Sequence, residues 1–426
     1  MIQLDRPTSS KRRWIICGLL FAATAINYVD RQMIGILKPI LSREYSWSET
    51  DYGTIVFWFQ AAYAIGYLGF GRFIDKVGAR LGYSTAVVVW SIAHICHAFI
   101  TGLASLTLAR IGLGLGESGN FPAGLKAVTD WFPKKERALA TGIFNAGANI
   151  GAIITPLIVP IITIYFGWRM AFIITGFLTI AWLIAWWLIY KLPQHDPKVS
   201  EAELALIQSD PKDVPVTISW STLIRRPETW GYAGAKFLID PIWWMFLFWL
   251  PDFFAKRHHL DLKSFGPPLV AVYIMSDLGS IAGGYLSSRL LSAGYSLNSA
   301  RKIAMLVSAI AVLPIFGAAF VDDLWTATLL VGIATAAHQA FSCNLYNYPG
   351  DIFPRFAVAS VVGIGGAAGA IGGMLMAKYA GFVLDTIGSY GPIFAVAGSV
   401  YFVALAVVHW FSPHYDLVEL EPTSSL

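Results

Sequence analysis

Long apolar stretches separated by short polar ones run along almost the whole chain. A helix that crosses a lipid bilayer needs about 20 mostly apolar residues, and about twelve stretches approach this length. They lie at 14–38, 52–71, 82–101, 103–126, 138–163, 168–190, 228–254, 267–290, 301–320, 324–348, 356–384 and 390–411. This pattern predicts an all-α membrane protein with twelve transmembrane helices.

The longest polar segment divides these spans into two groups of six. It contains several prolines and a short amphipathic stretch in which Ser200 and Glu203 have the spacing of a capping box. We therefore expect an N-terminal six-helix bundle at 1–192, a cytoplasmic central loop at 193–226 and a C-terminal six-helix bundle at 227–426.

Composition and charge placement agree with a lipid environment. The chain is 56% hydrophobic and 13% charged, with a mean hydropathy of +0.60, whereas a soluble domain carries about 25% charge. Lys and Arg gather in alternate short loops, which predicts that both termini and the central loop are cytoplasmic. No small-residue cleavage site follows the first apolar run, so we expect a retained span. The three cysteines lie in apolar stretches and imply no disulfide framework.

The two halves repeat each other in sequence. Asp130-Trp-Phe-Pro matches Asp351-Ile-Phe-Pro, and at the same offset Gly142 matches Gly363 and Gly151 matches Gly372. The alternative is a chance match between Gly-rich helices. Because both matched segments follow a predicted cytoplasmic loop at the same place in each half, we favour a parallel internal repeat, an arrangement found in secondary transporters.

The loop between the second and third spans carries a patterned set of charges. It reads Gly71-Arg-Phe-Ile-Asp75-Lys-Val-Gly78-Ala-Arg80. Gly78 can turn the chain, and Asp75 can pair with loop cations or cap a helix. We expect Asp75, Arg80 and Arg137 to latch one closed state of the molecule. The alternative is a solvated cluster of loop charges.

This loop resembles the Gly-x-x-x-Asp-Arg/Lys-x-Gly-x-Arg signature of the major facilitator superfamily, although its counterpart in the second half lacks the Asp. Asn27-Tyr-Val-Asp30-Arg31, Ala109-Arg-Ile-Gly-Leu-Gly-Leu-Gly-Glu117 and Asp130-Trp-Phe-Pro resemble the anion:cation symporter branch. Ala337-His-Gln-Ala looks most like the hexuronate transporters. The resemblance covers nearly the whole chain. It implies the major facilitator fold of two pseudo-symmetric six-helix bundles, import of sugar acids such as galacturonate or glucuronate with protons, and titrating acids at Asp30 and Glu117.

Charged residues inside the apolar spans support this interpretation independently. A charge at mid-bilayer costs about 2.5–3.5 kcal/mol or more, so it is normally functional or paired. Arg110 and Glu117 are almost two helical turns apart and share a face about 10 Å apart, which leaves room for an anion or another helix. Four nearby glycines reduce the bulk around Glu117, and a carboxyl group kept from water holds a proton more readily. We expect Glu117 to carry protons; the alternative is a structural pair that locks helices.

Asp30 and Arg31 are neighbours in the first span and point about 100° apart on a helix. Arg31, helped by Arg110, is the expected anchor for the substrate carboxylate, because a guanidinium group matches the geometry of a carboxylate. Asp30 is the second expected proton carrier. The alternative for Asp30 is a partly hydrated charge near the membrane surface.

Other polar side chains in the spans are candidates for binding substrate hydroxyl groups. Lys236 lies four positions before Asp240, so it either binds substrate or only pairs with this acid. The remaining candidates, some of which we expect to hold helices together, are Tyr28, Tyr63, Asn145, Asn149, His338, Gln339 and Asn344.

Three patterns indicate other functions and are set aside. Gly114-x-Gly-x-x-Gly matches the dinucleotide-binding fingerprint but has no preceding strand. Gly116-Glu-Ser-Gly resembles a motif of intramembrane serine proteases, but twelve repeated spans disfavour that class. His94 and His97 are interpreted as satisfied or interface histidines and not as a metal site. The chain has no nucleotide-binding loop.

We therefore expect a proton-coupled symporter, not an enzyme, that imports a sugar-acid anion by alternating access. The expected partners are a small organic anion, the proton and the lipid bilayer, with no nucleic acid, no metal and no organic cofactor, and we expect a monomer. The alternatives are a transporter of another organic anion (an aldonate, glucarate or phthalate), an exporter and, in a different class, an intramembrane hydrolase or a receptor.

Overall fold

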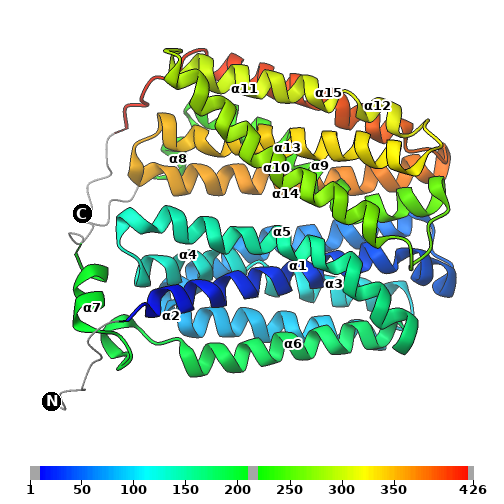
Figure 1. The fold of residues 1–426 in the computed structure, drawn as a ribbon, viewed down its shortest axis with the longest axis horizontal. Helices are drawn as coiled ribbons and strands as arrows, with labels where there is room; N and C mark the ends of the chain where they lie inside the picture. The colour runs from blue at the N-terminus through cyan, green and yellow to red at the C-terminus, as the bar shows by residue number, and fades with distance from the viewer. Residues whose placement is uncertain (1–9, 210–218, 421–426) are drawn as a thin grey trace. The chain divides into compact units, whose positions relative to one another are not determined.

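The computed structural model describes residues 10–209 and 219–420, and within these ranges the chain is helical (Figure 1). The long helices are α1 (Arg12–Tyr45), α2 (Glu49–Cys96), α3 (Leu103–Glu117), α4 (Asn120–Trp131), α5 (Lys134–Phe166), α6 (Trp168–Ile189), α9 (Pro227–His258), α10 (Gly266–Ser292), α11 (Leu297–Val312), α13 (Leu324–Ile352), α14 (Arg355–Thr386) and α15 (Gly391–Phe411). The short helices are η1 (His97–Phe99), η2 (Pro193–His195), α7 (Glu201–Ile207), α8 (Trp220–Ile224) and α12 (Ile315–Ala318).

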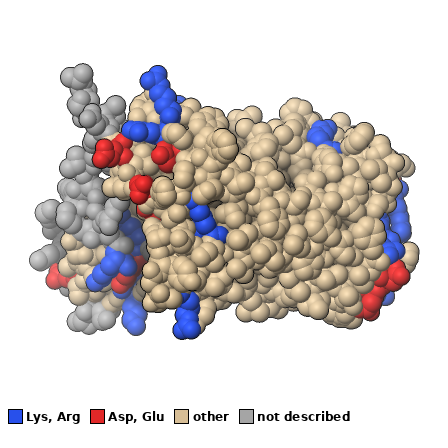
Figure 2. All heavy atoms as spheres, turned by 90° about the horizontal axis from the view of Figure 1, so that it is seen from above, with Lys and Arg blue, Asp and Glu red and all other residues tan. Residues whose placement is uncertain are grey.

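The helices match the predicted membrane spans. In the described part of the chain, nine helical segments are long and apolar enough to cross a membrane. One of them, Glu49–Phe99, contains two predicted spans, and α1 and the successive helices α3 and α4 cover two more. The prediction of an all-α membrane protein is therefore confirmed. On the face seen in Figure 2, charged side chains gather mostly toward the two ends, and uncharged residues cover most of the band between them.

The turn predicted between the second and third spans lies at Gly78, whose φ of 81° and ψ of 167° are not helical, so α2 consists of two helices that meet at this kink. Glycine tolerates this positive φ because it has no Cβ. By contrast, the predicted span 103–126 is interrupted at Ser118 and Gly119. Pro122 lies in the first turn of α4, where its missing N–H cannot continue the hydrogen bonds of α3.

The chain forms two compact units with the bounds Met1–Ile34 plus Ala61–Val214 and Gly35–Gln60 plus Pro215–Leu426. The adjoining ends of α1 and α2 thus cluster with the second unit, although the sequence repeat places them in the first half. The division into two six-helix bundles at 193–226 stays a prediction.

Equivalent glycines of the repeat have equivalent surroundings. A Cβ on Gly151 of α5 would lie 2.4 Å from the carbonyl oxygen of Ala25 in α1, and a Cβ on Gly372 of α14 would lie 2.2 Å from that of Phe237 in α9. Each glycine therefore lets one helix approach the first helix of its own half. This shared packing supports an internal structural repeat.

The second part of α2 packs closely against α3. A Cβ on Gly116 would lie 2.4 Å from the backbone nitrogen of Trp90, and one on Gly119 would lie 2.5 Å from the Cβ of Ala86. The glycines predicted to reduce bulk near Glu117 thus bring two backbones together. This contact also positions the Trp90 side chain toward α1.

Gly116→Ala is expected to lower the free energy of unfolding, because overpacking a close contact costs about 1–3 kcal/mol. The measurement is thermal unfolding of the purified protein in detergent. Gly142→Ala is the matched control, since a Cβ on this α5 glycine meets no heavy atom within 4 Å. Equal melting temperatures for the two variants would contradict the packing argument.

The central segment is anchored to the start of α1. Ser200 accepts a hydrogen bond from the Glu203 backbone N–H at 3.1 Å, as the predicted capping box requires. The Glu203 carboxylate, however, accepts hydrogen bonds from the backbone N–H groups of Arg12 and Arg13 at 3.0 and 3.1 Å. It therefore caps α1 instead of its own helix. Burial would raise the pKa of Glu203, but its hydrogen bonds, including one from Ser10, lower it.

A buried ion cluster connects helix ends in the second unit. Lys38 of α1 is 1% exposed, and its Nζ lies 2.5 Å from Glu49 of α2 and 2.7 Å from Asp252 of α9. The rings of Tyr52 and Trp249 lie 4.8 Å from the same nitrogen. The two carboxylates and the aromatic faces compensate the cost of burying this cation.

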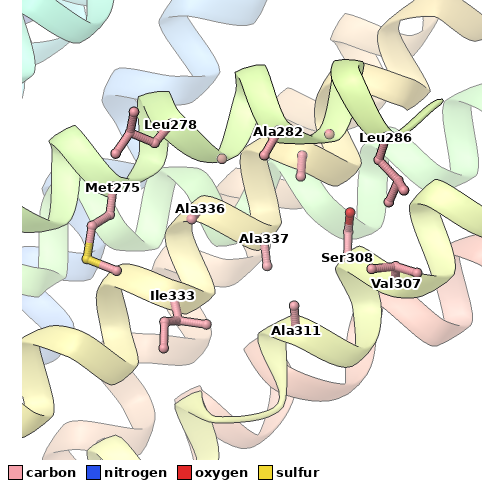
Figure 3. A pocket seen from close by; sticks show the side chains of 13 residues that line it. Met275, Leu278, Ala282, Leu286, Val307, Ser308, Ala311, Ile333, Ala336 and Ala337 are labelled. Carbon is pink, nitrogen blue, oxygen red and sulfur yellow. The ribbon is translucent and has the colours of Figure 1, made fainter. Parts of the chain in front are cut away.

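An apolar groove of about 390 Å³ lies between α10, α11 and α13 of the second unit (Figure 3). Its lining side chains are aliphatic or small, and Ser308 is the polar one among them. An anion in this groove would lose hydration without gaining a cation, so the groove is not the expected substrate site.

Candidate functional site

The first unit contains a buried ion pair that joins α1 to α3. Arg31 donates from Nε to the Glu117 carboxylate at 2.7 Å and from Nη2 to the side-chain oxygen of Asn27 at 3.0 Å. Arg31 and Glu117 are 2% and 0% exposed. The ring centroids of Tyr28 and Tyr63 lie 4.8 and 4.9 Å from the guanidinium carbon. A carboxylate and two aromatic faces therefore surround one cation.

Helical geometry explains how these groups meet. Asn27 and Arg31 are four positions apart on α1, so their side chains lie on the same face. Arg31 is a poor residue to bury alone, and Glu117 supplies the opposite charge at lipid depth. Arg110 of α3 is also fully buried, and its Nη2 donates to the backbone carbonyl of Arg31 at 3.4 Å. The two arginines and Glu117 thus belong to one connected site.

Asp30 faces a different niche from Arg31, its neighbour in the sequence. Its carboxylate accepts hydrogen bonds from the Trp90 Nε1–H at 3.0 Å and the Thr179 hydroxyl at 3.2 Å. Nε2 of His94 lies 3.2 Å from the other Asp30 oxygen. These groups come from α2 and α6, and Asp30 is fully buried. Asp30 of α1 and Glu117 of α3 therefore have different partners, although Asp30 and the Arg31 that pairs with Glu117 are neighbours in the sequence.

The predicted hydroxyl-binding residues are distributed over both units. On α5 of the first unit, Asn145 is exposed and Asn149 is partly exposed. On α13 of the second unit, His338 is buried and Gln339 is partly exposed. Asn344 donates to the backbone carbonyls of Gly283 and Ala340 at 3.1 and 3.0 Å, so it links α13 to α10.

A second cationic centre lies in α9. Lys236 pairs with Asp240 at 2.7 Å and donates to the Tyr346 hydroxyl at 2.8 Å. Close by in the sequence, the Trp243 ring stacks on His338 with centroids 5.7 Å apart. The structure thus contains the i, i+4 pair anticipated for Lys236, and its role in binding stays a prediction.

The predicted latch residues make local contacts in this structure. Arg80 donates to the carbonyl of Trp187 at 2.8 Å, and Arg137 donates to the carbonyl of Phe132 at 3.0 Å. Asp75 is exposed on α2. Their common role as a latch stays a prediction.

Sequence reasoning missed several polar residues that the structure buries. Trp90 and Thr179 are hydrogen-bond partners of Asp30. The sequence predicts a satisfied or interface histidine at position 94 but not its contact with Asp30. Gln60 of the second unit is 2% exposed, and neither amide atom has a hydrogen-bond partner among the described residues. The available signal for Gln60 was its position as a lone amide within an apolar span, which is expensive in lipid without a partner.

This arrangement suits reversible binding of an anion and a proton. A buried guanidinium flanked by aromatic rings can hold a carboxylate in a bidentate manner. Glu117 competes for the same cation while it is ionised. Among the described residues, no group of three or more potential metal-ligating side chains comes together.

Comparisons with known proteins agree with the geometry. The family model described as Major Facilitator Superfamily matches residues 20–377. The hexuronate transporter of Escherichia coli K12 is 32% identical over 404 residues, covering 93% of each chain. A probable L-galactonate transporter of the same organism is 29% identical over 391 residues, covering 90% of this chain and 85% of the relative.

A solved structure shares the fold. It is that of a bacterial homolog of the human lysosomal transporter Spinster, in an inward-facing and unoccupied conformation. The TM-score is 0.70 at 18% sequence identity, covering 96% of this chain and 97% of the other. At this identity the similarity establishes the fold alone.

Proposed function

Because the chain belongs to the Major Facilitator Superfamily, and is therefore a multi-pass membrane transporter and not an enzyme, we propose that it imports a sugar-acid anion together with protons. The observation that carries this proposal is the buried Arg31–Glu117 pair between the rings of Tyr28 and Tyr63. Hexuronates such as galacturonate and glucuronate are the proposed substrates. The 32% identity to a hexuronate transporter supports this choice.

Competition between two anions for one cation supplies the coupling. Ionised Glu117 occupies Arg31 at 2.7 Å, so a substrate carboxylate must displace it. A proton on Glu117 removes its charge and weakens its attraction for the guanidinium group. Arg31 can then bind the substrate carboxylate. A proton and an anion therefore favour each other's binding, and this reciprocity is the thermodynamic requirement for symport.

Asp30 is proposed as the second proton carrier, and Arg110 as the residue that supports Arg31. Lys236, His338, Gln339, Asn145 and Asn149 are the proposed hydroxyl-binding groups. Alternating access by rocking of the two predicted halves would carry the ligands across a bacterial inner membrane, with both termini cytoplasmic.

The proposal is tested by uptake of radiolabelled galacturonate into proteoliposomes that contain the purified chain. An inward proton gradient should accelerate uptake and drive accumulation, and a protonophore should abolish the accumulation. Uptake that is indifferent to the gradient would contradict the coupling. Lack of galacturonate uptake under any gradient would contradict the substrate.

An aldonate is the second candidate substrate, because the probable L-galactonate transporter is almost as similar to this chain as the hexuronate transporter. Aldonates share the carboxylate and the hydroxyl groups but lack the sugar ring. A competition series with unlabelled glucuronate, galactonate, glucarate and phthalate separates these possibilities. The strongest competitor of galacturonate uptake identifies the preferred anion.

A further inference from the structure

The niche around Asp30 contains a buried histidine that the proposed binding of substrate does not use. His94 of α2 is 0% exposed, and its Nε2 lies 3.2 Å from one carboxylate oxygen of Asp30. The same nitrogen lies 2.7 Å from the hydroxyl oxygen of Thr175 in α6. His94 therefore contacts a proposed proton carrier that lies next to Arg31 in the sequence.

The hydrogen bonds of Thr175 favour one tautomer of His94. The Thr175 hydroxyl lies 2.9 Å from the backbone carbonyl of Ala171, to which it can donate its single hydrogen. In that arrangement its oxygen accepts from Nε2 of His94, so the tautomer that fits carries its hydrogen on Nε2. The nearest Asp30 oxygen lies 3.2 Å from Nε2 and has no hydrogen-bond partner among the described residues. Nδ1 of His94 is buried without a hydrogen-bond partner among the described residues, which leaves it available to accept a proton.

The other side of the Asp30 carboxyl group can adapt to protonation. The Thr179 hydroxyl lies 3.2 Å from Asp30 and also 3.2 Å from the backbone carbonyl of Thr175. It can therefore donate to Asp30 when the acid is ionised and to the backbone when the acid is protonated. The niche can satisfy both protonation states without a large rearrangement.

Three ionisable groups face His94 from the elements packed around it. They are Asp30 from α1, His97 from η1, whose ring centroid is 6.0 Å away, and Arg110 from α3. Phe172 of α6 covers the remaining side of the ring, with centroids 5.3 Å apart. His97 hydrogen-bonds to the carbonyl of Ala93 at 2.7 Å, and among the described residues no ion pair or hydrogen bond joins it to Asp30. His94 is thus the histidine positioned for exchange with the acid.

We propose that Asp30 gains and loses its coupling proton through His94, an inference that rests on the proposed proton-coupled transport. In the state of the transport cycle that admits water to the niche, a proton adds to Nδ1 and gives the imidazolium. The Nε2–H bond then breaks as an O–H bond forms on Asp30, which leaves neutral histidine with its hydrogen on Nδ1 and a neutral carboxylic acid. The reverse transfer returns the proton. Opposite charges disappear together, so the transfer suits a site without water.

His94→Gln is the principal test, because glutamine can donate a hydrogen bond to Asp30 but cannot relay a proton. Proton-driven galacturonate uptake should fall at least about tenfold, since a positioned proton-transfer group contributes 10²–10⁴-fold. Counterflow of galacturonate at one fixed pH should remain near the wild-type rate. His97→Gln is the matched control and should change neither rate. Wild-type proton-driven uptake in His94→Gln would overturn the inference.

Thr175→Val is the second variant, for use if His94→Gln does not fold. Valine has the shape of threonine but cannot accept the hydrogen bond that orients the imidazole. The pH profile of uptake should shift while counterflow at saturating substrate is retained. An unshifted profile would overturn the inference.

Infrared difference spectroscopy separates failure of this inference from failure of the proposed function. The C=O band of protonated Asp30, identified by its loss in Asp30→Asn, can be titrated without any substrate. Its pH midpoint should differ between wild type and His94→Gln and should be unchanged in His97→Gln. An unchanged midpoint in His94→Gln would overturn the relay, whereas a changed midpoint without galacturonate uptake would contradict only the proposed substrate.

Discussion

Arg31→Lys is expected to weaken sugar-acid binding about 30-fold or more while leaving a folded protein. Lysine keeps the positive charge but lacks the planar fork that binds a carboxylate through two parallel hydrogen bonds. Loss of one partner from a buried charge pair typically costs 2–5 kcal/mol, which corresponds to a decrease in affinity of about 30-fold or more. The measurement is equilibrium binding of galacturonate by isothermal titration calorimetry.

A double substitution separates binding from structural support. Arg31→Gln leaves Glu117 buried without its cation, which is expected to cost about 3–5 kcal/mol of stability. Arg31→Gln combined with Glu117→Gln removes both charges and should recover much of that stability, but not substrate binding. If the double variant binds galacturonate with wild-type affinity, the pair is structural and the anchor lies elsewhere.

Arg169→Lys is the matched control for Arg31→Lys. Arg169 of α6 also lies over an aromatic ring, with 4.2 Å between its guanidinium carbon and the centroid of Trp168, but it is exposed. We expect wild-type binding in this variant. A comparable loss of affinity would indicate a nonspecific effect of replacing arginine in the first unit.

The helices could be predicted from the sequence because lipid imposes one simple rule, a long apolar run for each crossing. The residues at which the helices begin and end depend on local backbone geometry and not on hydropathy. Gly78 divides α2 into two helices at a sharp kink, and Pro122 lies in the first turn of α4, just after the break that separates α4 from α3. Both features depend on local backbone geometry, to which a hydropathy count is insensitive.

The sequence indicates which charged residues are important, but it does not indicate which residues they pair with. The spacing of Arg110 and Glu117 correctly placed them on one helix face, but the salt bridge of Glu117 is to Arg31, 86 positions earlier. No local periodicity contains that contact. The cost of an isolated charge in lipid indicates that a partner exists but not which residue it is.

The same limit applies to Lys38 and His94. Lys38 is at the end of a predicted span and could be interpreted as a loop cation, yet it is buried between Glu49 and Asp252. His94 and His97 have a spacing that suggests an interface or a metal. The contact of His94 with Asp30 comes from the packing of α2 against α1, which Gly116 on α3 helps to position through Trp90.

Glu117→Gln is expected to separate transport from accumulation. Glutamine has the shape of glutamate and can still accept the hydrogen bond from Arg31, but it can neither ionise nor carry a proton. A gradient of one pH unit can drive about tenfold accumulation per coupled proton. We expect the accumulation ratio of galacturonate in proteoliposomes to fall to about one, while counterflow, which needs no net proton movement, continues.

Glu136→Gln is the control for the loss of an arginine-paired glutamate. Glu136 accepts a hydrogen bond from Arg13 at 2.8 Å near the start of α1, outside the buried site, and the pair is partly exposed. Surface pairs of this kind contribute about 0–1 kcal/mol, so accumulation should remain at the wild-type ratio.

Proton-driven accumulation in Glu117→Gln would show that this carboxyl group is not a coupling site. An uncharged glutamine leaves Arg31 more available to an anion than ionised glutamate does, so the substitution should not by itself prevent substrate binding. Loss of counterflow in Glu117→Gln would therefore show that the Glu117 side chain contributes directly to the substrate-binding surface.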